Sequence, residues 1–402
     1  MNSKKDRIWL CFGVLVSLLI AVSMLVLGHK QALFLFEGKT WYSDSWSYIP
    51  KILGIEEGAS TPYPIMFILG RIFTGFLGAE WGLAVVLALL QFLSYWGVYY
   101  YFHKYLSASR TLTVPESFAL SVTVCGLFFY SMIYSDEFVK WGIPNHYLGV
   151  YSPNPFHNAT YIAARPFTIL AFFAFAELLD EYEEKLNVPK MVWFSVVLLL
   201  ATMTKPSFTL IFVTLACLVM LGKLVMARFS NFKNTFFLGC AFIPTLLDLL
   251  YQYSDVFTGT DLEGEAAGIG IEYMKVWGLE SYNHWLAVLL VLLFPLVVLI
   301  FHCRDLLKNA LYRLGWGLYA IGLLTFVFLY EKGYRVDHAN FAWGYMAGLF
   351  FVVMVSVLVM LQDSVGKKGK LWQRALMWLA FAVHVCYGVA YFKWILDGNY
   401  YV

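Results

Sequence analysis

One stretch decides the class of this protein: IWLCFGVLVSLLIAVSMLVLG, residues 8–28. It carries no charged side chain, and about 20 apolar residues are enough for a helix to cross the hydrocarbon core of a bilayer. Lys4, Lys5 and Arg7 precede it, as basic residues precede the apolar part of a signal peptide. Because no small-x-small cleavage site follows, we expect a retained first transmembrane helix.

The composition of the whole chain agrees with this first stretch. Of its 402 residues 60% are hydrophobic and only 13% are charged, against about 25% charged in an average soluble domain, and the mean hydropathy is +0.68. A soluble protein could not cover so much apolar surface. The composition therefore excludes a soluble enzyme, a disordered chain, a coiled coil and a secreted disulfide scaffold. The net charge of +2 gives no sign of a nucleic-acid partner.

Apolar stretches of spanning length recur along the chain and predict an all-α polytopic membrane protein, with residues 1–402 forming a single membrane domain. We expect about eleven transmembrane helices. They are predicted at residues 8–28, 81–101, 116–134, 160–179, 191–204, 207–221, 234–254, 284–301, 311–330, 339–361 and 372–396. A further apolar stretch, 62–78, contains Arg71 and three glycines, and we expect an interfacial or re-entrant helix there.

The charges predict the orientation. Short cytoplasmic loops collect Lys and Arg, and most basic residues fall on one side if the N-terminus is cytoplasmic and 62–78 does not cross. If 62–78 did cross, the run Gly366-Lys-Lys-Gly-Lys370 would lie outside, against this rule. The sequence thus predicts a multi-pass plasma-membrane protein, bacterial in type, with an external C-terminus. The predicted external loops are 29–80, 135–159, 255–283 and 331–338, and the third reads as a flexible acidic loop.

Ionisable side chains gather near the predicted outer ends of the spans, where charges at membrane depth are costly and usually functional. Asp44 follows the first span, Arg165 precedes Pro166 just inside the fourth, and Lys205 lies between the fifth and the sixth. The other candidates flank the fourth and tenth spans and are His157, Asn154, Asn158, Arg335 and His338. Cations and one carboxylate around an apolar cavity suit a substrate with a lipid tail and a phosphate head.

Two of these side chains also have simpler structural interpretations. Asp44 could cap an interfacial helix that continues through Ile52. Lys205 could extend along the apolar surface to the lipid headgroups. The absence of other motifs narrows the function: no phosphate-binding loop of an ATP-driven pump, no His-Glu-x-x-His of a zinc protease and no Asp-x-Asp of a metal-held nucleotide sugar occurs in the chain.

The first half of the chain resembles, in pattern, the C-type (GT-C) integral membrane glycosyltransferases, of the kind that builds bacterial surface polysaccharides. The resemblance is carried by Trp41-Tyr-Ser-Asp44-Ser-Trp-Ser-Tyr48 after the first span and by Thr61-Pro-Tyr-Pro-Ile-Met-Phe67 before the non-spanning stretch. It implies transfer of a sugar from a polyprenyl-phosphate donor to an extracytoplasmic glycan, lipid or polymer. The family carries a pair of acidic residues where this chain has Asp44 alone, so a divalent metal cofactor is left open and no metal ligand is predicted.

In this reading Asp44 is the catalytic base, since an ionised carboxylate can accept the proton that the acceptor hydroxyl loses as it attacks the anomeric carbon. Lys205, Arg165 and His157 are predicted to bind the donor phosphate, whose charge grows as it leaves. The second-rank substrate-binding residues are Arg335, His338, Asn154 and Asn158.

Two other functions remain open at this stage. A polysaccharide polymerase or ligase of the O-antigen kind would use Arg165 and Arg335 and would not need Asp44. A lipid or sugar transporter would place polar groups near the middle of the membrane and would contain paired broken helices.

Overall fold

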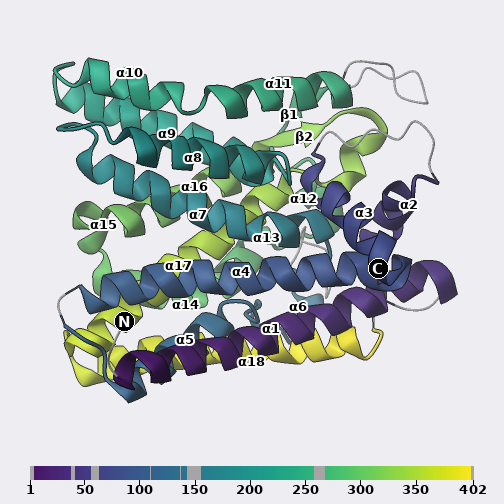
Figure 1. Cartoon of the computed structure of the whole chain (residues 1–402), viewed down its shortest axis with the longest axis horizontal. Helices are drawn as coiled ribbons and strands as arrows, with labels where there is room; N and C mark the ends of the chain where they lie inside the picture. The colour runs from purple at the N-terminus through teal and green to yellow at the C-terminus, as the bar shows by residue number, and fades with distance from the viewer. Residues whose placement is uncertain are drawn as a thin grey trace.

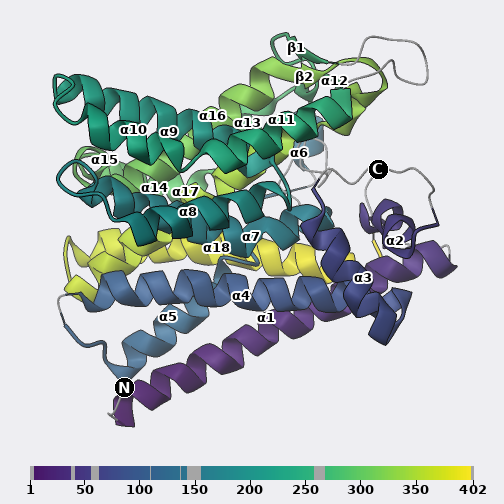
Figure 2. The ribbon, with the colours of Figure 1, turned by 45° about the horizontal axis from the view of Figure 1, so that its top comes forward.

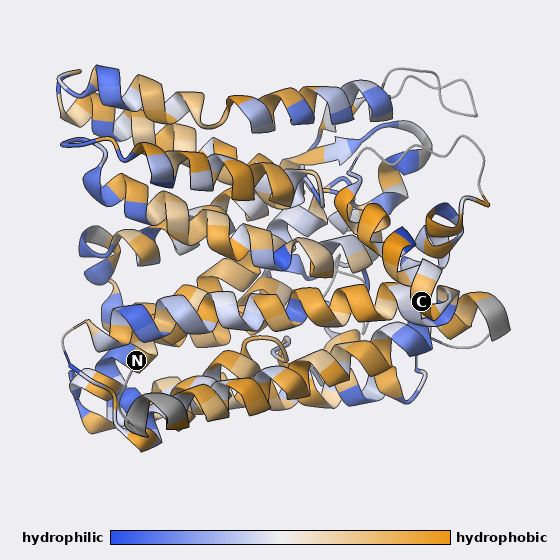
Figure 3. Ribbon diagram, viewed as in Figure 1, coloured by the Kyte–Doolittle hydropathy of each residue, from blue (hydrophilic) through white to orange (hydrophobic). Residues whose placement is uncertain are grey.

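The computed structural model describes residues 4–37, 41–55, 63–108, 110–135, 137–142, 155–257 and 268–399. Within these ranges the chain forms an elongated bundle in which the long helices run side by side along one axis (Figure 1). Hydrophobic residues cover most of the helix length, and hydrophilic residues are concentrated toward the ends of the bundle (Figure 3). The prediction of an all-α, multi-pass membrane protein is confirmed at this level.

Seven helices of the described chain are long and apolar enough to cross a membrane singly. They are α1 (Lys4–Glu37), α4 (Ala79–Ser107), α7 (Ala159–Glu181), α9 (Ser207–Met226), α16 (Ala310–Phe328), α17 (Ala342–Gly366) and α18 (Leu371–Leu396). Two bent pairs raise the count to nine if each pair is one span: α10 (Phe232–Cys240) with α11 (Ile243–Phe257), bent by 46°, and α13 (His284–Val291) with α14 (Leu293–His302), bent by 66°.

The predicted count of about eleven spans is therefore not supported. The segments predicted at 116–134 and 191–204 are α5 (Val114–Gly126) and α8 (Val188–Thr202), which have 13 and 15 residues. At 1.5 Å per residue these helices are only about 20 and 22 Å long, less than the hydrocarbon thickness of about 30 Å. Apolar composition predicted which stretches form apolar helices but not where each helix ends.

Short elements connect the long helices. They are α2 (Ser45–Leu53), α3 (Ile65–Leu77), α6 (Glu137–Lys140), α12 (Trp277–Glu280), α15 (Asp305–Lys308), the 3₁₀ helix η1 (Gly333–His338), and the strands β1 (Ile269–Ile271) and β2 (Leu329–Glu331), which pair antiparallel. The 13-residue α3 lies within the stretch predicted not to cross. The first part of the predicted loop 29–80 is helical, because α1 continues to Glu37. Residues 258–267 of the predicted flexible acidic loop 255–283 lie outside the described residues, and the part that follows them contains β1 and α12.

The connections fall into two groups. The links α4–α5, α7–α8, α9–α10 and α17–α18 lie at one end of the bundle, on the left of Figure 1, and α2, α3, β1, β2 and α12 lie at the other (Figures 1 and 2). The grouping matches the loops assigned to opposite sides from their charges. Which end faces the cytoplasm stays a prediction.

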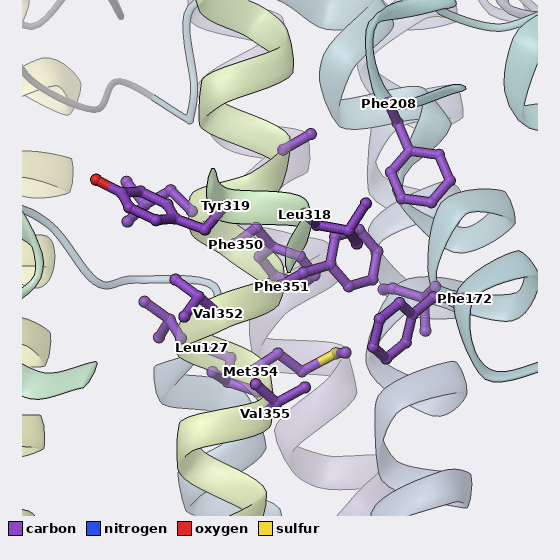
Figure 4. Packing of buried hydrophobic residues seen from close by; sticks show 14 of the residues in the cluster. Leu127, Phe172, Phe208, Leu318, Tyr319, Phe350, Phe351, Val352, Met354 and Val355 are labelled. Carbon is purple, nitrogen blue, oxygen red and sulfur yellow. The ribbon is translucent and has the colours of Figure 1, made fainter. Parts of the chain in front are cut away.

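Helix α17 forms the centre of the bundle and is buried along its spanning length. It packs against α16 through glycines: a Cβ atom on Gly322 would lie 2.9 Å from the Gly344 carbonyl oxygen, and one on Gly348 would lie 2.7 Å from that of Leu318. Small residues let two backbones approach closely inside a membrane. Phe350 and Phe351 on α17 then pack into the aromatic core with Phe172 and Phe208 (Figure 4).

Helix α5 ends at Gly126, and the chain continues through a turn at residues 127–129 into a non-helical segment that reaches residue 135 and is buried as far as Met132. Its backbone is held inside the protein, where Ser131 N–H donates to the His384 carbonyl on α18 at 3.2 Å. A side chain at Gly388, one turn further along α18, would collide with the Phe129 carbonyl. The His384 imidazole also accepts the Phe294 N–H at 3.2 Å, at the break between α13 and α14. Non-helical backbone at membrane depth requires such internal partners.

Candidate functional site

The candidate site is built around the first turn of α7. Asn158 caps this helix: its Oδ1 accepts from the Tyr161 N–H at 2.8 Å and from the Thr160 hydroxyl at 2.6 Å. Its Nδ2 donates to the Tyr48 hydroxyl at 2.9 Å and to Oδ2 of Asp44. Because both sides of the amide are bonded, the side chain has one orientation and ties the start of α7 to the Asp44 carboxylate. The structure thus gives Asn158 an organising role.

Asp44 precedes α2, but its side chain makes no capping hydrogen bond to that helix. Instead Oδ1 lies 3.2 Å from Nε2 of His157, and the Asp44 N–H donates to the His157 carbonyl at 3.1 Å. The simpler interpretation of Asp44 as a helix cap is wrong for its side chain. Two segments far apart in the sequence, 43–45 and 157–158, are joined here by both backbone and side-chain contacts.

The carboxylate stays accessible while its surroundings favour the ionised form. The Asp44 side chain is 29% exposed. Burial acts to raise its pKa, but the hydrogen bond and charge of His157, the charge of Lys205 and the Asn158 amide together hold the pKa below its ordinary value. His157 is 9% exposed and its Nδ1 is buried without a hydrogen-bond partner. Its predicted role was phosphate binding, yet its closest charged contact is the carboxylate of Asp44.

Lys205 occupies the turn between α8 and α9, where its N–H still bonds to the Ala201 carbonyl at 2.9 Å. The side chain turns inward and is 8% exposed, so it does not extend to the headgroups. Its Nζ lies 3.3 Å from the Thr160 hydroxyl and 5.0 Å from the centre of the Trp343 ring. Burial lowers the pKa of Lys205 to about 8, against the opposing effect of the carboxylates of Asp44 and Glu331.

Arg165 lies deeper on α7 and is 4% exposed. Its Nη1 donates to the Gln91 side chain at 3.3 Å, and its Nε is buried without a partner. The guanidinium lies 5.0 Å from the centre of the Tyr161 ring, 5.4 Å from that of Phe350 and 5.9 Å from that of Phe128, in the turn that follows α5. No ion pair to either Arg165 or Lys205 occurs in the part of the chain that the structure describes.

Lys205 borders two cavities. The smaller one, of about 20 Å³, also borders Arg165, Thr168 and Ser207, and has room for about one water molecule. The larger one, of about 340 Å³, runs between α9 and α11. Its polar lining includes Tyr63, Lys205, Gln252, Glu331, Arg335 and Asn340, and its apolar lining includes Leu210, Ile211, Leu249, Leu329 and Phe341. Lys205 therefore connects the Asp44 cluster with both cavities.

The second carboxylate of the site, Glu331, was not predicted. It ends β2 and is 8% exposed, and its Oε2 accepts from Arg335 Nε at 2.9 Å and from Asn340 Nδ2 at 2.6 Å. Pairing of β2 with β1 sets its position, with Ile269 as its register partner. The spacing of Glu331 and Arg335 by four residues is a signal that the sequence did contain.

The other second-rank candidates are less central. Arg335 borders the larger cavity and is paired with Glu331. His338 is exposed at the end of η1. Asn154 lies outside the described residues. Within the described chain, no three His, Cys, Asp or Glu side chains are placed to hold a metal ion together.

Comparison of the chain with known protein families, curated proteins and solved structures finds no match. The function is therefore inferred from the geometry of this site and from the resemblance to the C-type glycosyltransferases.

Proposed function

We propose that the protein is a membrane glycosyltransferase that moves a sugar from a polyprenyl-phosphate donor to a glycan, lipid or polymer acceptor at the outer face of the plasma membrane. The observation that carries the proposal is the pair of buried cations, Arg165 and Lys205, around one small cavity. An unpaired buried charge is unfavourable by several kcal/mol. A site that keeps two of them is suited to an anion that arrives with the substrate.

The larger cavity supports a substrate with a lipid tail. Its wall between α9 and α11 is formed by aliphatic side chains, Leu210, Ile211 and Leu249 among them, while Lys205 and Arg335 border its polar part. A polyprenyl chain seated against the aliphatic wall would present its phosphate to Lys205. The arrangement of an apolar wall next to a cation distinguishes a lipid phosphate from a free phosphate or a neutral lipid.

The chemistry then follows from the charges. The acceptor oxygen attacks the anomeric carbon and loses its proton, and the bond between that carbon and the phosphate oxygen breaks with its electron pair going to the phosphate. Arg165 and Lys205 stabilise the charge that grows on the leaving phosphate, and fixed charges act strongly in a site shielded from water. The acceptor proton passes to the pair formed by Asp44 and His157, in which the negative charge of Asp44 makes the pair basic.

A second candidate function is transport of a lipid-linked anion. One observation favours it: the bundle contains two bent helix pairs and a non-helical segment after α5, and the ring of Phe128 at the start of that segment lies 5.9 Å from the Arg165 guanidinium. Discontinuous helices beside a substrate site are typical of transporters. A polymerase or ligase would also use Arg165 and Arg335, but it would give the carboxylate of Asp44 no function.

A transfer assay tests the proposal. The purified protein is reconstituted into vesicles with synthetic polyprenyl-phosphate sugars and a mixture of envelope glycans and lipids, and sugar-labelled products are identified by mass spectrometry. We expect a glycosylated product from the wild type and none from the Arg165→Met/Lys205→Met double variant. Movement of the donor across the bilayer with no product from any donor would instead establish the transporter.

A further inference from the structure

The contacts around the Asp44 carboxylate do not suit it to take the acceptor proton directly. Oδ1 faces Nε2 of His157 at 3.2 Å, and Oδ2 accepts from the Asn158 amide. Both oxygens are therefore held by donors from the two residues that precede α7 before any acceptor arrives. Lys205 adds a positive charge nearby. A carboxylate in these surroundings is suited to holding a neighbouring cation in place.

The imidazole of His157, in contrast to the Asp44 carboxylate, has one polar atom that no other group holds. Its Nε2 is directed to Asp44, and its Nδ1 is buried with no hydrogen-bond partner. Leaving a buried polar atom unbonded costs free energy, so such an atom in a folded site calls for an explanation. An imidazole that donates through Nε2 to a carboxylate carries its lone pair on Nδ1, which makes that atom the proton acceptor of the pair.

The Trp343 ring lies near both the imidazole of His157 and the proposed phosphate cation, Lys205. Trp343 lies nearly parallel to His157, with 6.4 Å between ring centres, and Lys205 Nζ lies 5.0 Å from the centre of the same Trp343 ring. Tyr42 flanks the imidazole, with 5.7 Å between ring centres. The imidazole of His157 and the ammonium of Lys205 therefore lie near the same aromatic side chain, which places the proposed proton acceptor in the neighbourhood of the phosphate cation.

Building on the proposed glycosyl transfer, we propose that His157 is its catalytic base, taking the acceptor proton on Nδ1, and that Asp44 is the positioning residue that fixes the Nε2–H form of the imidazole. The acceptor O–H bond breaks, its proton passes to Nδ1, and its electron pair forms the bond to the anomeric carbon. The carbon–phosphate oxygen bond breaks at the same time, and its electron pair stays on the phosphate. The imidazolium formed is stabilised by the Asp44 carboxylate, as in the pairing of histidine and aspartate in serine hydrolases.

Two substitutions of His157 distinguish a catalytic base from a residue that only holds Asp44 in place. The Gln amide reaches roughly the place of Nε2, so His157→Gln keeps a hydrogen bond to Asp44 but has no group that accepts a proton. The Asn amide reaches roughly the place of Nδ1, so His157→Asn is a second variant that lacks both the base and the bond to Asp44. Neither change touches Arg165 or Lys205, so binding of polyprenyl phosphate by the same samples reports whether the site is folded.

We expect His157→Gln and His157→Asn to bind polyprenyl phosphate within about threefold of the wild type and to lose about 10²- to 10⁴-fold in sugar transfer, the usual contribution of a positioned base. Transfer by His157→Gln within about tenfold of the wild type would overturn the inference, because His157 would then only support Asp44. That result would leave the glycosyltransferase itself intact. A wild-type protein with no transfer from any donor would overturn both the function and this role for His157.

Discussion

Replacing Arg165 with methionine tests whether its positive charge serves donor binding or the stability of the fold. Methionine keeps much of the length of the side chain and removes the charge. The guanidinium is 4% exposed and has one hydrogen bond, to Gln91 at 3.3 Å, together with three aromatic neighbours. The described part of the chain contains no carboxylate within ion-pair distance of it. The protein therefore carries the cost of burying this charge without a partner that offsets it.

The expected change in stability follows from these contacts. Three cation–ring contacts contribute about 0.5–1 kcal/mol each and the hydrogen bond about 1 kcal/mol. The desolvation of a buried cation costs several kcal/mol. The favourable and unfavourable terms nearly cancel, so we expect Arg165→Met to lose at most about 1 kcal/mol, or to gain stability. Breaking a buried ion pair would instead cost about 3–5 kcal/mol.

The expected change in donor binding is much larger. Loss of one charge-assisted contact in a shielded site costs about 1.5–3 kcal/mol, which corresponds to a weakening of about tenfold to more than a hundredfold. The assay is the apparent melting midpoint in detergent together with titration of polyprenyl phosphate. Arg110→Met, at the far end of the bundle where Arg110 pairs with Glu116, is the matched control. A strongly destabilised Arg165→Met protein with wild-type donor affinity would refute the reasoning.

Four further outcomes are expected. Burial lowers the pKa of Lys205 to about 8, so its positive charge is lost as the pH rises from 7 to 9. Donor affinity should therefore fall over that range in the wild type and stay level in Lys205→Arg. Titration of polyprenyl phosphate at each pH checks this. Asp44→Asn should insert normally, since its carboxylate caps no helix, yet transfer about 10²- to 10⁴-fold more slowly than the wild type, measured as initial rates. In a cysteine-free background, Lys368→Cys should resist an impermeant thiol reagent added outside intact cells, and labelling there would contradict the topology. Gly388→Ala should fail to yield folded protein, because its Cβ would collide with the Phe129 carbonyl. Gly222 has open space around it, so the control Gly222→Ala should yield monodisperse protein on size-exclusion chromatography.

The sequence predicted the helical membrane class because spanning length and lack of charge are direct consequences of the bilayer. It overcounted the spans because an apolar run has the same composition whether it is one straight helix, a bent pair or a half-helix followed by extended chain. The non-helical segment after Gly126 is hydrogen-bonded to the carbonyl of His384 on α18, which is far away in the sequence. No local pattern in residues 116–134 contains that information.

The candidate site was predicted in part. Asp44, Lys205 and Arg165 were singled out as costly charges near span ends, and the structure places Lys205 beside both of the others, electrostatically coupled to Asp44 and across a small cavity from Arg165. The pairing of Asp44 with His157 could not be predicted, because it depends on how the segment before α2 meets the start of α7. Glu331 was missed because its burial depends on a two-stranded sheet formed by short, irregular segments.

The central claim is that Arg165 and Lys205 receive the phosphate of a lipid-linked donor. The measurement that tests it most directly is the affinity of the purified protein for polyprenyl phosphate relative to polyprenol of the same length, which lacks the phosphate. We expect the wild type to bind the phosphate at least tenfold more tightly than the alcohol, and the Arg165→Met/Lys205→Met double variant to bind both equally. The account would be contradicted if the wild type showed no preference for the phosphate, or if the double variant kept the full preference.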